Sequence, residues 1–172
     1  CVKSANGVVT KHFDARDNEF IKKWLRYMFQ QAEIVVNDKI EWLLKMTMID
    51  DEKLLKKLDK NLFDVTVLGF NSSRFDSNLF KEYFNVPDEW YVDNTSLIGS
   101  STSLKQFIIK CSHGKYGLRF IDAQSYVAGG TLKQFGIDFG GEENSCKGIF
   151  PYEVVNSDNF NQVLSQSEPF EY

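Results

Sequence analysis

The chain has 172 residues, 42% hydrophobic and 26% charged, which is typical of a soluble globular protein with one core of ordinary size. Its net charge of -4 argues against a nucleic-acid binder held by a broad basic surface, although a narrow cleft that holds metal ions would still accept nucleotides. No run of about 18 apolar residues occurs, so the sequence predicts no membrane-spanning helix.

Cysteine and histidine residues are few and scattered: Cys1, Cys111, Cys146, His12 and His113. None has CxxC or HxxxH spacing, so the sequence predicts no structural zinc site. An odd, scattered set of cysteines is typical of a reducing compartment, and we expect an intracellular protein without specifying the compartment. Cys111 lies in an apolar run and is interpreted as a small core residue.

The first third of the chain is predicted to be helical. Apolar residues follow helical spacing over residues 18–36, and Asp17 or Asn18 is placed to cap this helix. Residues 39–58 continue in helical spacing in two pieces, with a break near residues 50–51. Lysines and glutamates in this second stretch predict a solvated face.

Three strands and a short helix are predicted next: strands over residues 63–70, 104–111 and 116–122, and a helix over residues 76–84. Residues 86–103 are rich in turn-forming residues. Residues 112–115 are a hairpin signal between the last two strands. The pattern predicts an α/β or α+β layered domain, with a mixed sheet flanked by helices.

The remainder of the chain predicts two more helices and a loop. A short helix is expected over residues 131–139 after the break at residues 129–130, a loop over 140–152, and a final helix over 154–164. We therefore divide the chain into a helical N-terminal part, residues 1–62, and an α/β part, residues 63–172, within one domain overall.

The first candidate site follows the predicted strand over residues 63–70. Asn71 stands in the turn, and Phe75 and Asp76 stand where the next helix begins. A metal-dependent phosphodiesterase needs a carboxylate at such a position, because the strand fixes its location and the loop leaves it reachable. The alternative is structural: Asp76 or Ser77 is an ordinary N-cap, and Asn71 tolerates the turn.

Two further candidates follow along the chain. Asp122 closes an apolar strand and is either an acid beside a metal or, as we favour, a cap of the following loop. The hydroxyl of Thr131, at a helix start, can bond a phosphate. Its alternative is a plain N-cap, with Leu132 and Phe135 as core residues.

The last candidate is Lys147, which precedes a Gly and a Pro in residues 147–153. These two residues set an irregular backbone. A lysine in such a loop can stabilise charge on a phosphoryl group or orient the attacking water. A solvated loop lysine is the alternative.

The order of these residues resembles the 3′→5′ proofreading exonuclease domain of family B DNA polymerases. More narrowly, it resembles the protein-primed subgroup found in linear plasmids, some phages and virus-like mobile elements. The resemblance covers roughly residues 63–170. It is carried by Asn71-x3-Phe75-Asp76, then Thr131-Leu132-x2-Phe135, then Lys147-x2-Phe150. Residues 69–76 and 147–153 resemble the linear-plasmid branch in particular.

The resemblance implies a ribonuclease-H-like fold, here missing an edge of its sheet. It implies two-metal phosphodiester hydrolysis with Mg²⁺ or Mn²⁺. Asp76 would be a catalytic metal ligand, and Lys147 would match the family's catalytic lysine. The implied partners are the single-stranded 3′ end of DNA, the remainder of the polymerase chain and a terminal protein primer.

The resemblance also implies a set of DNA-binding residues. Asn71 and Phe75 would hold the single-stranded 3′ end, with the ring of Phe75 stacked on a base. Thr131 and Leu132 would match the single-strand-binding motif of the family. Residues 125–126, Ser-Tyr, lie nearer Asp122 and are the alternative for that place.

Several family features are missing from this sequence. The first exonuclease motif is an Asp-x-Glu within a strand, and its letters occur only at residues 17–19 and 50–52, which both predict helix openings. No tyrosine has an Asp four residues later, so the third motif is absent, and so is the Asp-Thr-Asp polymerase signature. Two metal ions roughly 4 Å apart need about four carboxylates. We therefore expect the isolated chain to be inactive.

Three functional hypotheses remain at this stage. The first is a fragment of a DNA-directed DNA polymerase that carries part of its proofreading exonuclease domain. The second is a non-catalytic, exonuclease-like module that binds a nucleic acid or a protein. The third is an unrelated α/β enzyme whose motifs agree by chance.

Overall fold

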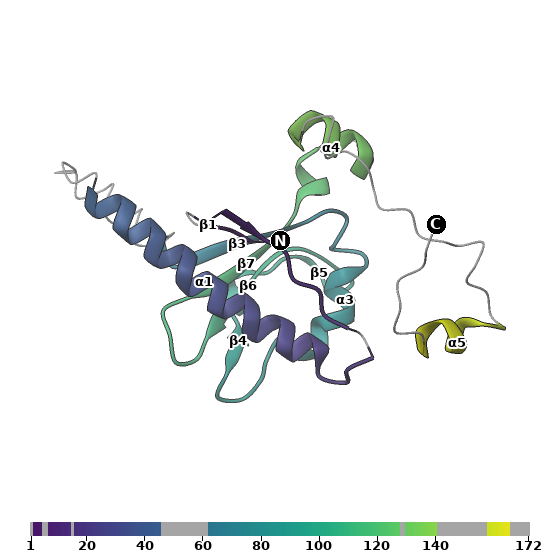
Figure 1. Cartoon of the computed structure of the whole chain (residues 1–172). Helices are drawn as coiled ribbons and strands as arrows, with labels where there is room; N and C mark the ends of the chain where they lie inside the picture. The colour runs from purple at the N-terminus through teal and green to yellow at the C-terminus, as the bar shows by residue number, and fades with distance from the viewer. Residues whose placement is uncertain are drawn as a thin grey trace. The chain divides into compact units, whose positions relative to one another are not determined.

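The computed structural model describes residues 2–4, 7–14, 16–45, 62–127, 130–140 and 158–165 (Figure 1). The chain divides into two compact units, Cys1–Gly129 and Gly130–Tyr172. The first unit contains a mixed sheet and a long helix. The second contains two short helices. Each unit is described by itself below.

A five-stranded sheet forms the centre of the first unit. Its strand order is β3 (Asp64–Gly69), β7 (Gly117–Asp122), β6 (Ser103–Cys111) and β4 (Trp90–Val92), and β5 (Ile98–Ser100) also pairs with β6. Strands β3 and β7 run parallel, whereas all pairs that involve β6 are antiparallel. The protein is thus α/β, with a mixed sheet flanked by helices.

Helix α1 (Phe20–Lys45) covers one face of this sheet (Figure 1). Its fully buried residues recur at helical spacing: Ile21, Leu25, Ala32 and Val36. Before the helix, the carboxylate of Asp17 accepts the backbone N–H of Glu19 at 2.9 Å, so Asp17 is the cap. The two predicted helical stretches join into one helix as far as Lys45, and residues 46–58 lie outside the described residues.

The core between α1 and the sheet is strongly aromatic. The ring of Phe107 lies 4.7 Å from that of Phe120, nearly parallel at 8°, and 4.6 Å from that of Phe84. Trp24 of α1 packs edge-on against Phe80 and Phe120. Offset and edge-to-face ring pairs add stability beyond the apolar area that they bury, so this cluster holds helix and sheet together.

The three strands predicted from the sequence are confirmed as β3, β6 and β7, and the predicted hairpin joins β6 to β7. The turn-rich region contains two strands of three residues each, β4 and β5, which the sequence did not predict. The beginning of the chain also contains two strands that the sequence did not predict: β1 (Val2–Ser4), which pairs with β2 (Gly7–Val9). Strands this short show no recognisable alternation of apolar and polar residues.

The second unit contains α4 (Leu132–Gly140) and α5 (Phe160–Ser165). The predicted helix over residues 131–139 is confirmed. The predicted final helix is confirmed from residue 160, and residues 154–157 lie outside the described residues. No helix among the described residues is long and apolar enough to cross a membrane.

Candidate functional site

The candidate site lies where β3 and β7 end together. Because these strands are parallel, their carboxyl ends meet at one edge of the sheet, with Gly69 opposite Asp122. This edge is the common place for binding residues in α/β sheets, because loops leave it there while the strands keep the loops in place. The turn after β3 carries Asn71, Phe75 and Asp76.

Asp122 ties this turn to the end of β7. It is 2% exposed, and one carboxylate oxygen accepts the backbone N–H groups of Asn71 at 2.8 Å and Gln124 at 3.1 Å. The other oxygen accepts the backbone N–H of Ser73 at 3.0 Å. The favoured interpretation of Asp122 as a loop cap is therefore confirmed, and the loop that it caps includes the candidate site itself.

The same contacts keep Asp122 ionised. Burial opposes the charged form, but hydrogen bonds from Ser73, Gln124 and Asn71 outweigh this cost and hold the pKa of Asp122 below its ordinary value. A carboxylate that accepts several backbone N–H groups is stabilised as an anion. The turn is thus held by a buried negative charge.

Two residues allow the tight turn. A Cβ at Gly69 would lie 2.5 Å from the Oγ atom of Ser72, so no larger residue fits without displacing that side chain. Asn71 has a φ of 56°, a left-handed conformation that asparagine tolerates better than most residues. The prediction that Asn71 accommodates the turn is confirmed.

The side chain of Asn71 has a further property. Its Oδ1 atom is buried and accepts no hydrogen bond from any residue that the structure describes. A buried polar atom without a partner costs free energy, and such atoms occur at sites that a ligand or a water completes. The position is therefore compatible with a ligand contact as well as with the turn.

Phe75 and Asp76 stand on the open side of the turn. The ring of Phe75 is 64% exposed, and Asp76 is the first residue of α3 (Asp76–Phe80) and is also exposed. The helix begins after Phe75 without a side-chain hydrogen bond as a cap. The alternative that Asp76 or Ser77 is the N-cap is therefore wrong, because the helix already includes both residues.

The opposite side of α3 is fixed by its packing. Phe80 is buried, and its ring lies 5.1 Å from the ring of Trp24 and 5.6 Å from that of Phe120. The side chain of Lys81, which follows the helix, donates to the carbonyl of Ser101 in the β5–β6 turn at 2.6 Å. The helix is thus fixed on the side of Ser77 and Phe80, which are buried, while Asp76 is exposed.

The other predicted residues lie elsewhere in the chain. Thr131 belongs to the second unit, and its hydroxyl accepts the N–H of Gln134 at 3.2 Å, which confirms the N-cap interpretation. Leu132 is 45% exposed, so its interpretation as a core residue is wrong for this unit. Leu132 directly follows the N-cap residue Thr131, and its side chain is only partly covered by other residues. Lys147 lies outside the described residues, and so does Phe150.

The alternative single-strand motif lies in the first unit. Residues 125–126 belong to a short 3₁₀ helix, η3 (Ala123–Tyr126), which begins directly after Asp122. Tyr126 is 70% exposed. Both Thr131 and residues 125–126 therefore remain candidates for this role.

The described residues do not fit a two-metal centre. No three His, Cys, Asp or Glu side chains gather anywhere in the described part of the chain, and Asp76 is the one exposed carboxylate on the site turn. Two metal ions need about four carboxylates. Residues 17–19 precede α1, as the sequence predicted, and Asp17 is engaged by Glu19 and Lys23.

One exposed residue beside the predicted ones was missed. Arg74 directly precedes Phe75 and is exposed. It lies within residues 69–76, which carry the resemblance, but the sequence assigned it no role, and only its exposure next to Phe75 identifies it. Comparison of the chain with protein-family models, with curated proteins and with solved structures gave no match. Membership of a family therefore stays a proposal.

Proposed function

We propose that this chain is part of the 3′→5′ proofreading exonuclease domain of a protein-primed family B DNA polymerase, with a ribonuclease-H-like fold. Its described part binds the single-stranded 3′ end of DNA. One observation carries this proposal: an exposed aromatic ring and an exposed carboxylate, Phe75 and Asp76, stand together on a turn that Asp122 holds rigid. Rigid placement of an exposed ring is what base stacking requires.

The neighbours of Phe75 suit a nucleic-acid strand. A base stacks on the exposed ring, and the guanidinium of the exposed Arg74 next to it can pair with a phosphate. Asn71, one turn earlier in the chain, offers an amide without a partner for its oxygen. Such a contact set is local and small, which agrees with a chain of net charge -4 that has no broad basic surface.

The catalytic part of the proposal concerns the complete polymerase. There Asp76 serves as one ligand of Mg²⁺ or Mn²⁺, and Lys147 stabilises charge near the reacting phosphate. Thr131 and Leu132 help to hold the strand. The resemblance matches a single carboxylate, Asp76, whereas two metal ions need about four, so we expect the isolated chain to bind DNA without hydrolysing it.

A second candidate function is a non-catalytic module that binds nucleic acid or protein through the same turn. The exposed ring of Phe75 favours it as much as it favours the first function, because base stacking needs no metal ion. The two functions differ in their dependence on Asp76, because only a metal ligand is needed for hydrolysis.

Replacing Phe75 with alanine is expected to weaken binding of single-stranded DNA by about 1–3 kcal/mol, or roughly 5- to 150-fold, because a stacked base loses its platform. Fluorescence anisotropy with a labelled 12-nucleotide thymidine strand measures this change. Leu79→Ala is the matched control, since it removes a similarly exposed apolar side chain from α3, the helix that directly follows Phe75. Unaltered affinity in Phe75→Ala would remove the stacking role. Equal affinity for linear and circular single-stranded DNA would show that the chain does not prefer a strand end.

Replacing Asp76 with alanine is expected to change the free energy of unfolding by less than about 0.5 kcal/mol, because the side chain is exposed. In the full-length polymerase it is expected to lower editing about 100-fold, the scale of a lost contact to transition-state charge. Release of the 3′-terminal nucleotide from a mismatched primer measures editing. Glu82→Ala, which removes another exposed carboxylate, should leave editing intact. Normal editing in Asp76→Ala would favour the binding module.

A further inference from the structure

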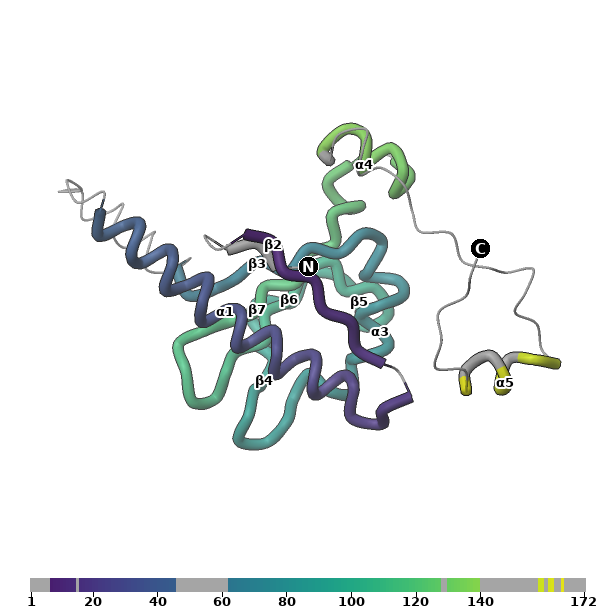
Figure 2. Tube along the Cα trace, in the orientation of Figure 1, coloured from purple at the N-terminus to yellow at the C-terminus, as the bar shows by residue number. Residues whose placement is uncertain are grey.

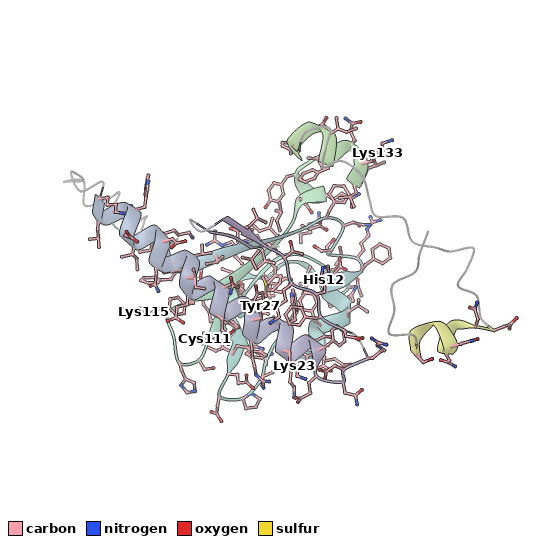
Figure 3. The ribbon with its side chains drawn as sticks, viewed as in Figure 1. His12, Lys23, Tyr27, Cys111, Lys115 and Lys133 are labelled. Carbon is pink, nitrogen blue, oxygen red and sulfur yellow. The ribbon has the colours of Figure 1, made fainter. Side chains whose placement is uncertain are left out.

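A groove of about 470 Å³ lies at the other end of the sheet from the Asn71 turn. Its lining residues come from α1, from the turn before β4 and from the hairpin that joins β6 to β7. Figure 2 traces these three segments. Cys111 closes β6 at this end, whereas the candidate site lies at the carboxyl end of β7. Figure 3 marks the groove end of the sheet with the labels of Cys111 and Lys115.

The floor of the groove is aromatic and fixed. The rings of Phe29 and Trp90 stack 5.8 Å apart at an angle of 29°. Trp90 is 2% exposed, and its indole N–H donates to the carbonyl of Tyr83 at 2.7 Å. The backbone N–H of Ser112 donates to the carbonyl of Glu89 at 2.9 Å, which joins the hairpin to the turn before β4. The groove is therefore preformed rather than a gap between loose loops.

The charge of the lining is negative. Arg26 forms two hydrogen bonds of 2.7 Å with the carboxylate of Glu89, and these bonds hold the pKa of Glu89 below its ordinary value. This pair is neutral as a unit. Two exposed carboxylates remain, Glu33 and Asp88, and neither forms an ion pair with the described residues. The groove thus has two uncompensated negative charges above an aromatic floor.

Tyr116 connects the floor to this charge. Its hydroxyl donates to the Oε1 atom of Glu33 at 3.4 Å, a long hydrogen bond that directs the carboxylate toward the groove. Burial, together with the negative charge of Glu33, raises the pKa of Tyr116 above its ordinary value, so the hydroxyl stays a donor. The partly exposed side chain of Tyr116 also lines the groove.

We propose that this groove binds an arginine side chain of a partner polypeptide. A guanidinium is planar, so it stacks on an aromatic face while its N–H groups reach carboxylates at the rim. Phe29 and Tyr116 supply the rings, and Glu33 and Asp88 supply the acceptors. A nucleic-acid strand does not fit, because its phosphates would meet the two carboxylates. The groove is therefore a site separate from the proposed DNA site.

The probe for this site is the peptide N-acetyl-Gly-Gly-Arg-Gly-Gly-amide. Its control is the same peptide with citrulline, which keeps the planar shape of arginine without its charge. In a ¹⁵N NMR titration of the whole chain, we expect amide shifts at Glu33, Asp88 and Tyr116, with at least 5-fold weaker binding of the citrulline peptide. Equal binding of both peptides, or shifts located elsewhere, would overturn the proposal.

Variants that each remove one negative charge distinguish binding in the groove from general attraction of the peptide to an acidic chain. Glu33→Gln and Asp88→Asn are each expected to weaken binding 2- to 5-fold, while Glu82→Gln, which removes an exposed carboxylate outside the groove, should leave it unchanged. Equal weakening by all three would show attraction to net charge alone and overturn the site. Concentration-dependent shifts of the same amides without peptide would instead identify a second copy as the occupant. None of these substitutions lies in the turn that carries Phe75, so the groove proposal and the DNA-binding proposal are tested independently.

Discussion

Replacing Asp122 with alanine is expected to lower the free energy of unfolding by about 3–5 kcal/mol, because three backbone N–H groups lose their acceptor in a buried place. Urea unfolding followed by tryptophan fluorescence measures the change. Asp122→Asn is the matched control: it keeps the size of the side chain and one acceptor oxygen, so its loss should be smaller. A loss below about 1 kcal/mol in the alanine variant would contradict the clamp.

The clamp also predicts how stability depends on pH. The pKa of Asp122 is lowered in the folded chain, so its stabilising contribution is complete above the unfolded pKa of about 3.9 and is lost as the pH falls through the lower folded pKa. The difference in stability between the native chain and Asp122→Ala should therefore shrink below about pH 4. A difference that is constant down to pH 2 would assign the loss to packing instead of charge.

The function of the site depends on the same clamp. Without Asp122, Asn71 and Ser73 lose their connection to the end of β7, and the turn that positions Phe75 has fewer fixed points. Without urea, and at a temperature where Asp122→Asn remains folded, the affinity of this variant for single-stranded DNA should fall between those of the native chain and Phe75→Ala. Such a result would make Asp122 a positioning residue for the proposed DNA contacts.

Replacing Phe80 with alanine is expected to cost about 3–5 kcal/mol of stability, because a buried ring leaves a cavity that the neighbouring rings cannot fill. Phe80 contacts rings on every side of the core: Trp24, Phe84, Phe107 and Phe120. It is also the large buried side chain of α3, so the helix that begins with Asp76 loses its anchor. The free energy of unfolding in urea measures the loss.

Phe80→Leu is the control for this experiment. Leucine keeps an apolar side chain of closer volume and is expected to cost less than about 1.5 kcal/mol. If Phe80 anchors the site, the leucine variant retains most DNA binding while the alanine variant loses it under conditions where both are folded. Equal DNA binding by the two variants would show that the turn is held by Asp122 alone.

The local pattern of the sequence was sufficient for the main elements. The buried residues of helix α1 recur at helical spacing, and strands β3, β6 and β7 are short apolar runs bounded by turn residues. The hairpin between β6 and β7 was also predicted, because the residues of a tight turn are adjacent in the chain. Strands β4 and β5 were missed, since three residues are too few to show a period.

The candidate site was predicted in part. Asn71, Phe75 and Asp76 were identified as members of one turn, because they are close in sequence. The exposure of Phe75 and the start of α3 at Asp76 without a side-chain cap were shown only by the structure. The groove on the other end of the sheet had no sequence signal, since its residues come from three distant segments.

By itself, the sequence determined the longer elements, α1, β3, β6 and β7, and the turn that carries the candidate residues, because these depend on side chains a few positions apart. The parallel pairing of β3 with β7 was decided only by the tertiary structure, and so was the clamp between Asp122 and Asn71, 51 positions apart. Such contacts form where burying the aromatic core outweighs the entropy lost in closing a long loop. A local sequence pattern does not show which of these two contributions is larger.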